Sequence, residues 1–209
     1  MSINATDLYE DGPAAGAKAK ILLIHFDGAI DAGGAGRMAI GQMLRSLHNE
    51  RVATFDADVL VDYRSHRPII TVEDWVSSPD MVMPQTVLDL VEDDMGNPIL
   101  VLHGAEPDAH WESFTNAISG ICERAGVEIT FSLHGVPSGV PHTRPTPVHV
   151  QATDASLLPA GGATIANHMQ FPAPLSTFVQ IRMGQRGMGG LALLGAVPFY
   201  MADTGYPAA

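Results

Sequence analysis

Residues 20–28 read Lys-Ile-Leu-Leu-Ile-His-Phe-Asp-Gly, an apolar run with a turn signal directly after it. The β-branched content of residues 20–26 and the Asp27-Gly28 pair predict a buried strand that ends in a turn. Residues 98–102 repeat this pattern and are followed by His103-Gly104. Continuous apolar runs are typical of central parallel strands, because both of their faces are covered. These two segments therefore predict the centre of an α/β sheet.

Helical and extended patterns alternate around these two strands. The spacing of apolar residues predicts helices over residues 31–49, 109–125 and 175–184. Further extended segments are expected at residues 51–63, 68–72, 86–91, 127–133, 148–151 and 191–199. The alternation predicts a single α/β domain over residues 20–209, with three α/β/α layers around a central, mostly parallel sheet. Residues 1–19 are acidic and contain small residues, Gly and Pro, so a flexible N-terminal arm is expected there.

The composition excludes several classes of protein. The 209 residues carry 11 Lys and Arg against 23 Asp and Glu, a formal charge of −12. The basic residues form no patch that would track phosphates, so no nucleic-acid partner is expected. The apolar runs are far shorter than the roughly 20 residues that a bilayer requires, and no membrane partner is expected either. One cysteine, Cys122, excludes an internal disulfide, and the absence of a basic and apolar leader predicts a cytoplasmic protein.

The segment Asp31-Ala-Gly-Gly-Ala-Gly-Arg-Met-Ala39 has two interpretations. Gly34-x-Gly36-x-x-Ala39 fits a dinucleotide-binding fingerprint, with Asp56 or Asp58 near the place of a ribose-binding carboxylate. The gap from the preceding strand is long for the tight turn that such a site needs. The same small residues also let a helix lie close to a sheet, and this packing interpretation is favoured. No cofactor is predicted.

Two further segments place charged residues at strand ends. Asp62, Arg64 and Arg67 lie in one short span, where the arginines suit a carboxylate or phosphate. An internal ion pair or a subunit contact is the favoured alternative. Glu106 and Asp108 follow the second central strand, at the edge where α/β proteins bind ligands. Asp108 is expected to cap a helix starting at residue 109, which leaves Glu106 as the functional candidate.

Residues 135–145, Gly-Val-Pro-Ser-Gly-Val-Pro-His-Thr-Arg-Pro, form the most unusual segment, with three prolines and two glycines. Its restricted backbone presents His142, Thr143 and Arg144 together, which suits a ligand, a partner or a subunit contact, with simple loop rigidity as the alternative.

The chain shows no complete catalytic or metal-binding pattern. Four histidines fall near strand ends, but they lack the spacing of a metal site, and no metal is predicted. They are His25, His103, His134 and His142. No nucleophile–base pair is evident in the sequence, and Cys122 is expected to be a buried, inert thiol.

Four segments in series resemble the PAC2 family, the proteasome assembly chaperone superfamily, in its actinobacterial-type branch. The matching segments are Asp31-Ala-Gly33-Gly34, Asp62-Tyr-Arg64 with Arg67-Pro68, Glu106-Pro-Asp108 with Trp111 and Phe114, and residues 135–145. The resemblance implies a phosphorylase/hydrolase-like core that usually assembles into oligomers. It also implies a C-terminal helical extension, for which these 209 residues contain no counterpart. In eukaryotic and archaeal relatives, the implied activity is the binding of proteasome α-subunits without chemistry.

These observations support two functional hypotheses. The leading one is a non-enzymatic homo-oligomeric interaction protein, with proteasome subunits as candidate partners. Its binding or interface residues are Asp31, Gly33, Asp62, Arg64, Arg67, Glu106, Asp108, Trp111, His142, Thr143 and Arg144. The alternative is a protein that binds a nucleoside, nucleotide or phosphate, or a phosphorylase/hydrolase-like enzyme, in the cleft at the strand ends. That site would use Asp31, Arg64, Glu106, His142 and Arg144 as anion-binding and acid–base groups.

Overall fold

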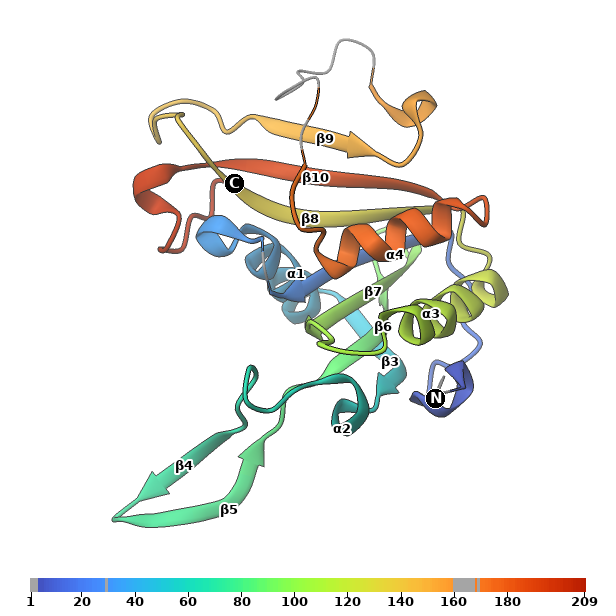
Figure 1. Cartoon of the computed structure of the whole chain (residues 1–209), viewed down its shortest axis with the longest axis vertical. Helices are drawn as coiled ribbons and strands as arrows, with labels where there is room; N and C mark the ends of the chain where they lie inside the picture. Colours follow the sequence, from blue (N-terminus) through green and yellow to red (C-terminus); the bar gives the residue numbers. More distant parts are fainter. Residues whose placement is uncertain (1–3, 29, 160–167, 169) are drawn as a thin grey trace.

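An eight-stranded sheet forms the centre of the computed structural model, which describes residues 4–28, 30–159, 168 and 170–209 (Figure 1). Its strands are β1 (Tyr9–Asp11), β2 (Ile21–Asp27), β3 (His48–Phe55), β6 (Thr86–Glu92), β7 (Pro98–Ala105), β8 (Ile129–Ser138), β9 (Val148–Ala152) and β10 (Gly189–Pro198). The α-helices are α1 (Ala35–Ser46), α2 (Ala57–Leu60), α3 (Trp111–Ala125) and α4 (Leu175–Gly184). Strands β4 (Ile69–Glu73) and β5 (Val76–Val82) form a separate two-stranded sheet.

The sheet is parallel in the middle and antiparallel at both sides. Its strand order is β1-β3-β6-β7-β2-β8-β10-β9, and the four neighbours β7, β2, β8 and β10 run parallel to one another. The remaining pairings, from β1 to β7 on one side and β10 with β9 on the other, are antiparallel. The predicted α/β fold is confirmed, and the two continuous apolar runs are the adjacent central strands β2 and β7.

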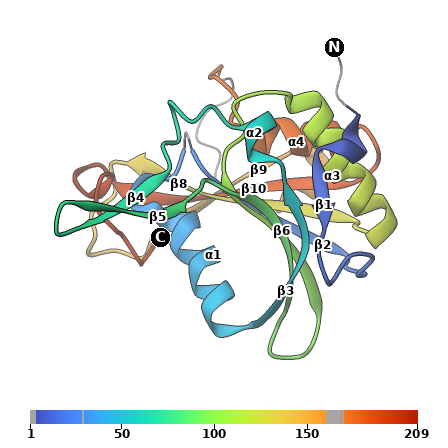
Figure 2. The same ribbon diagram turned by 90° about the horizontal axis from the view of Figure 1, so that it is seen from below.

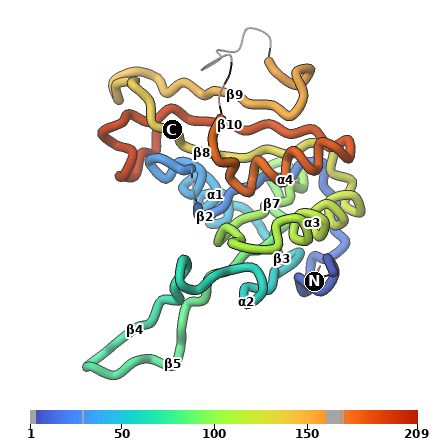
Figure 3. Tube along the Cα trace, viewed as in Figure 1, coloured from blue at the N-terminus to red at the C-terminus, as the bar shows by residue number. Residues whose placement is uncertain are grey.

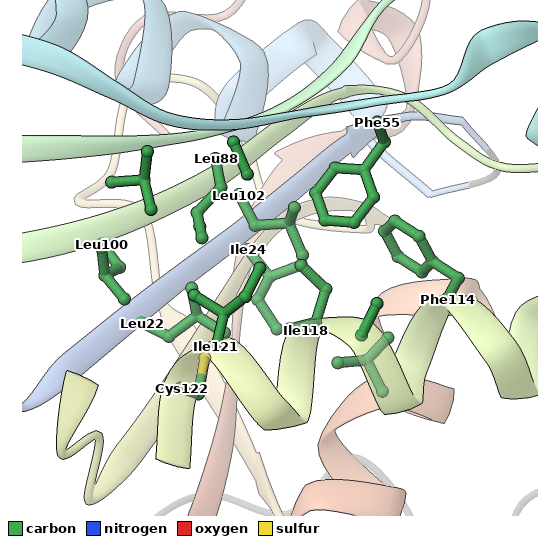
Figure 4. Packing of buried hydrophobic residues seen from close by; sticks show 14 of the residues in the cluster. Leu22, Ile24, Phe55, Leu88, Leu100, Leu102, Phe114, Ile118, Ile121 and Cys122 are labelled. Atoms are coloured by element: carbon green, nitrogen blue, oxygen red, sulfur yellow. The ribbon is translucent and has the colours of Figure 1, made fainter. Parts of the chain in front are cut away.

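Helices cover both faces of this sheet, with α1 on one face and α3 and α4 on the other (Figure 2). Successive residues of β2 serve both layers, since Leu22 and Ile24 pack towards α3 while Leu23 packs on the α1 side. Figure 4 shows Phe114, Ile118 and Cys122 of α3 against the apolar side chains of β2 and β7. Burial raises the pKa of the Cys122 thiol to about 12, which makes it the unreactive core residue that was expected.

The segment before β2 is part of the folded body and not a loose arm in its described part, residues 4–19. Strand β1 pairs with β3 at the sheet edge, with Tyr9 opposite Phe55. The Leu8 side chain is fully buried in the core, and Ala14 and Ala19 are buried with it. The strand pairing and further backbone hydrogen bonds from Gly12, Ala14 and Ala19 hold this segment. With Leu8 as its one fully buried large side chain, it has too little apolar content to produce a visible sequence pattern. No helix among the described residues is long and apolar enough to cross a bilayer.

Helix α4 is joined to β8 and β10 by a series of buried hydrogen bonds. The Ser132 hydroxyl donates to Gln180 Oε1 over 3.1 Å, and Gln180 Nε2 donates to the Leu191 carbonyl over 3.0 Å. One helical turn earlier, the Ser176 hydroxyl lies 3.2 Å from His134 Nε2. Burial lowers the pKa of His134, so the ring is neutral and its Nε2 accepts from Ser176 while its Nδ1 donates to the Ile30 carbonyl.

Because Gln180 is at the centre of these hydrogen bonds, removing its side-chain amide should lower the stability of the protein. Gln180→Met keeps the side-chain length but leaves the Ser132 hydroxyl and nearby backbone groups without their partner, so the free energy of unfolding should fall by about 2 kcal/mol. Gln185→Met, at the exposed end of the same helix, should change it by less than about 0.5 kcal/mol. Urea denaturation of both variants measures the difference, and equal stabilities would show that these hydrogen bonds do not hold α4.

Candidate functional site

The carboxylate of Asp31 accepts three backbone amides, from two segments, at the carboxyl end of β2. Asp31 Oδ1 accepts hydrogen bonds from the Gly36 amide over 2.8 Å and the Gly135 amide over 3.0 Å, and Oδ2 accepts one from the Arg37 amide over 3.1 Å. A negative group is favourable at the first turn of a helix, where amides are otherwise unpaired. Asp31 therefore fixes the start of α1 against β8.

The glycines around Asp31 are explained by this close approach. A Cβ on Gly36 would lie 2.4 Å from His25 Nδ1, and one on Gly135 would lie 1.9 Å from the Ala32 carbonyl oxygen. Gly33 has φ +65° and faces Tyr206 and Val197 at contact distance. The favoured packing interpretation thus accounts for these residues. Asp56, considered above for ribose binding, instead accepts the Asp58 amide at the start of α2.

A cavity of about 470 Å³ opens beside this junction. Its walls come from the end of β2, the turn before α1, Arg37 and the C-terminal residues 202–205. Inside it, the His25 ring is almost fully buried, with Nδ1 3.1 Å from the Leu133 carbonyl oxygen and Nε2 3.6 Å from Asp31 Oδ2. Of the sequence-predicted candidates, Asp31 and Gly33 line this cavity.

The Asp62 segment is fixed by the charged residues that were considered as an anion clamp. Arg64 Nη2 lies 2.8 Å from Asp62 Oδ2, and hydrogen bonds from Arg64 lower the pKa of Asp62 to about 2. Asp108 Oδ2 accepts from the Asp62 amide over 2.7 Å, and the Ser65 hydroxyl lies 3.0 Å from the same carboxylate. These contacts correspond to the favoured alternative, in which Asp62 and Arg64 form an internal ion pair. Arg67 is exposed.

The expected capping role of Asp108 is wrong. Helix α3 begins at Trp111, and its N-cap residue is His110, which has φ 57°. Asp108 lies too early to reach the first turn and binds the Asp62 segment instead. Glu106 is the residue that caps a helix, because its Oε1 accepts the Leu175 amide of α4 over 2.7 Å. Trp111 donates from its indole nitrogen to the Pro107 carbonyl and packs edge-on against Phe178.

The proline-rich segment starts later than expected, because β8 continues to Ser138. The His142 amide donates to the Tyr200 hydroxyl over 3.0 Å, and the His142 ring lies edge-on to the Tyr200 ring. Thr143 and Arg144 are exposed. The loop is therefore tied to the end of β10 by Tyr200, a residue that sequence analysis did not select.

Part of the candidate set gathers at the carboxyl ends of β2 and β7. His25 and His103 are register partners on these strands, and Glu106 Oε2 lies where a Cβ on the cavity-lining Gly28 would be. The His103 ring pairs with Asp89 over 2.8 Å, whereas His142 lies against Tyr200. Within the described residues, no group of three or more His, Cys, Asp or Glu side chains has a metal-binding arrangement. Arg64, Glu106 and His142, proposed for a nucleoside or phosphate cleft, are each engaged in separate local contacts.

Among the described residues, the most exposed apolar feature is the β4–β5 hairpin, of which sequence analysis predicted only the first strand. It projects from the body of the molecule, and Trp75 at its tip is 99% exposed (Figures 1 and 3). Asp74 and Trp75 have φ values of 49° and 63°, as the two central residues of a tight hairpin turn require. Two β-rich runs separated by two residues were the signal that could have revealed it.

Comparison with known proteins gives the family directly. The PAC2 family model matches residues 25–209. The chain belongs to the PAC2 family. A Mycobacterium tuberculosis protein of unknown function shares 34% identity with a TM-score of 0.89, over 97% of this chain and 70% of that one. A Corynebacterium glutamicum protein of unknown function shares 30% identity with a TM-score of 0.86, over 96% and 76%.

A more distant structure extends this likeness at the level of the fold. A proteasome-assembly chaperone homologue from M. tuberculosis has a TM-score of 0.78 at 22% identity, over 87% of this chain and 77% of that one. The resemblance identified from the four sequence segments, to PAC2 proteins of the actinobacterial type, is thereby confirmed. None of the curated proteins compared with the chain matches it.

The junction at Asp31 yields a matched pair of predictions on β8 and the loop after it. Gly135→Ala would press its Cβ into the Ala32 backbone, so the free energy of unfolding should fall by about 2 kcal/mol or more. Gly139→Ala has nothing within 4 Å of its Cβ and should change it by less than about 0.5 kcal/mol. Thermal unfolding checks the pair; a Gly135→Ala variant as stable as Gly139→Ala would contradict the close approach.

Proposed function

We propose that this PAC2 protein is a non-enzymatic interaction module that assembles as a homo-oligomer and engages proteasome subunits. The proposal of assembly rests on the exposed apolar side chains of the β4–β5 hairpin. The partner is suggested by relatives described as a proteasome-assembly chaperone homologue and, at 14% identity with a TM-score of 0.64, an archaeal proteasome activator from Pyrococcus furiosus.

The hairpin exposes apolar side chains on both of its faces. Ile69 pairs with Val82, and the next pair along the strands, Ile70 with Met81, points to the opposite face. All four side chains are more than half exposed in the single chain. Exposed apolar patches of this kind mark interaction surfaces, and unpaired strand edges promote association with other chains.

A second copy of the chain is the occupant that suits this hairpin best. A hairpin with one apolar face can lie on a flat surface, whereas one with two apolar faces has to be enclosed from both sides. Every copy carries the same hairpin, so self-association covers it without dependence on the supply of another protein. Closed symmetric assemblies of identical chains are the commonest solution to this requirement.

The proline-stiffened loop is the surface we assign to the proteasome subunit. His142 is fixed to Tyr200, which leaves the neighbouring Thr143 and Arg144 exposed on a restricted backbone. A loop that is already ordered loses little conformational entropy on binding, and an arginine suits an acidic partner surface. The loop is separate in sequence from the hairpin, so assembly and partner binding can be tested independently.

The assembly proposal predicts that polar substitutions in the hairpin reduce the molar mass in solution. The double variant Trp75→Ser with Met81→Ser should shift the protein from an oligomer to a monomer in size-exclusion chromatography with light scattering. The reason is that it removes two exposed apolar side chains that the second copy would cover. Met95→Ser, at a methionine of the β6–β7 turn that is 84% exposed against 54% for Met81, is the control and should leave the mass unchanged. A wild-type protein that is monomeric at all concentrations would overturn the proposal.

The partner proposal predicts that Arg144→Ala weakens capture of proteasome α-subunits from the same host by about tenfold, since an exposed charge at an interface is lost. Its free energy of unfolding should stay within about 0.5 kcal/mol of wild type, because the side chain is exposed. Arg45→Ala, on the exposed side of α1, is the matched control for both readouts. Unfolding of Arg144→Ala, or no capture by wild type, would contradict this role.

A further inference from the structure

A second cavity, small and apolar, opens between the sheet and the start of α4. Its volume is about 190 Å³, and its lining includes Val136 of β8, Ala192 and Leu194 of β10, and Pro174 and Thr177 at the start of α4. Pockets that hold drug-sized ligands have volumes of about 300–1,000 Å³. This cavity is therefore the size of a single large side chain.

The cavity is uncharged as well as apolar. Among the described residues that line it, His134 is the one titratable group. Burial lowers the pKa of the His134 ring, which therefore stays neutral. Both ring nitrogens have partners inside the protein, since Nδ1 lies 3.0 Å from the Ile30 carbonyl oxygen and Nε2 lies 3.2 Å from the Ser176 hydroxyl. An occupant of this cavity is therefore bound by apolar contact.

The side chain that most requires such a cavity is Trp75, at the tip of the β4–β5 hairpin. It is 99% exposed, more than any other large apolar side chain among the described residues. Tryptophan is enriched among the few residues that carry most of the binding energy of an interface, where it fills a pocket of the partner. Phe171, which lines the cavity, is 47% exposed, so an indole placed there would also cover a second aromatic ring.

The hairpin and the cavity are complementary in charge. The hairpin contains no basic residue, and its acidic residues are Glu73, Asp74 and Asp80. Thr177 of the cavity lies in the first turn of α4, where the helix dipole is positive and favours carboxylates. Insertion of Trp75 beside Thr177 brings Asp74, the preceding residue, to this end of the helix.

Other cavities of the molecule suit the hairpin less well. The cavity beside Asp31 is lined by three aspartates and one arginine, and a cavity of about 640 Å³ at the far end of α4 is lined by Glu128 and Asp154. Both would repel the acidic turn of the hairpin. A hollow beside Tyr200 has a volume of about 810 Å³, which is too large to enclose one side chain.

The hairpin and the small cavity lie on different sides of the chain. In Figure 1 the hairpin projects away from β8, β10 and β9, the strands that contribute to the cavity. A chain therefore cannot fill its own cavity with its own hairpin, and the contact has to join two copies through two different surfaces. Contacts of this kind repeat head to tail and close into a ring when the rotation between copies allows it.

We propose that Trp75 of one copy inserts into this cavity of the next copy, so that the chains assemble head to tail. The inference rests on the proposed assembly through the hairpin, to which it adds the docking site and the symmetry. The indole nitrogen donates one hydrogen bond, and the side-chain oxygens of Gln151 and Thr177, both in the lining, can accept it.

Fluorescence measures the insertion, because Trp75 and Trp111 are the two tryptophans of the chain. Trp111→Phe keeps an aromatic ring against Phe178 and leaves Trp75 as the only indole. In the oligomer, the Trp75 emission should be blue-shifted and quenched by acrylamide at least threefold less than in the monomer obtained by dilution. An oligomer in which Trp75 behaves as an indole in water overturns the insertion and leaves the assembly intact. A protein that is monomeric at all concentrations overturns both.

A carboxylate added to the cavity should prevent docking without harm to the fold. A negative charge in the first turn is favourable for α4 itself, but in Thr177→Glu it faces the acidic turn of the hairpin. This variant should raise the dissociation constant of the oligomer at least tenfold in light scattering and expose Trp75 to acrylamide. Thr143→Glu, the same substitution in the exposed loop, should change neither. Equal behaviour of the two variants would show that the hairpin docks elsewhere.

Engineered cysteines identify the contact directly, because Cys122 is buried and unreactive. Ser77→Cys places a thiol on the hairpin near Trp75, and Gln151→Cys places one at the cavity. After subunit exchange and mild oxidation, a mixture of the two variants should give a disulfide-linked pair, whereas each variant alone should not. Self-linking of Ser77→Cys would show that two hairpins pack against each other and would overturn the head-to-tail contact. An oligomeric mixture with no linked pair would overturn it too.

Discussion

The carboxylate of Asp31 is the contact on which the carboxyl end of the sheet depends. It accepts amides from the first turn of α1 and from β8, and so holds a helix and a strand at one point beside β2. The arrangement is possible only because Gly36 and Gly135 have no Cβ, which would collide with neighbouring atoms. The turn that Asp31 fixes also supports the C-terminal segment through Gly33, and thereby shapes the cavity.

The same solution recurs twice in the connection after β7. Glu106 reaches the first amide of α4, and Asp108 reaches the amide of Asp62. In each case a carboxylate from one connection satisfies a backbone donor in another, which is a strong, charge-assisted bond. In this chain, acidic residues at the ends of β2 and β7 therefore serve largely to bind one loop to another segment of the backbone. Function is then better sought in what these joints leave exposed, namely the hairpin.

Features set by local pattern were predictable, and features set by distant partners were not. The central strands and α3 follow from apolar runs and helical periodicity, which burial imposes directly on the sequence. Asp108 has all the local properties of a helix cap, and only its contact with Asp62, 46 residues away in the chain, shows its actual role. The extended segment at residues 68–72 was predicted, but its partner β5 and the hairpin were missed, because apolar residues point to both faces and neither face meets the core: Ile69 and Ile70 are both exposed. Leu8 was missed because a single buried residue makes no pattern.

Two of the motifs that carry the family resemblance meet at the base of the hairpin. Asp62 and Asp108 are joined there, and β4 begins a few residues later at Ile69. The other end of the hairpin leads into β6, where the Thr86 hydroxyl donates to the Ala105 carbonyl. One end is thus bonded to the last residue of β7 and the other to the connection that follows it. A rigid base limits the directions in which the hairpin can point, and an apolar surface held in one direction loses less entropy when a partner covers it. In the proposed assembly, the charged motif residues would act by orienting the hairpin, without touching the partner themselves.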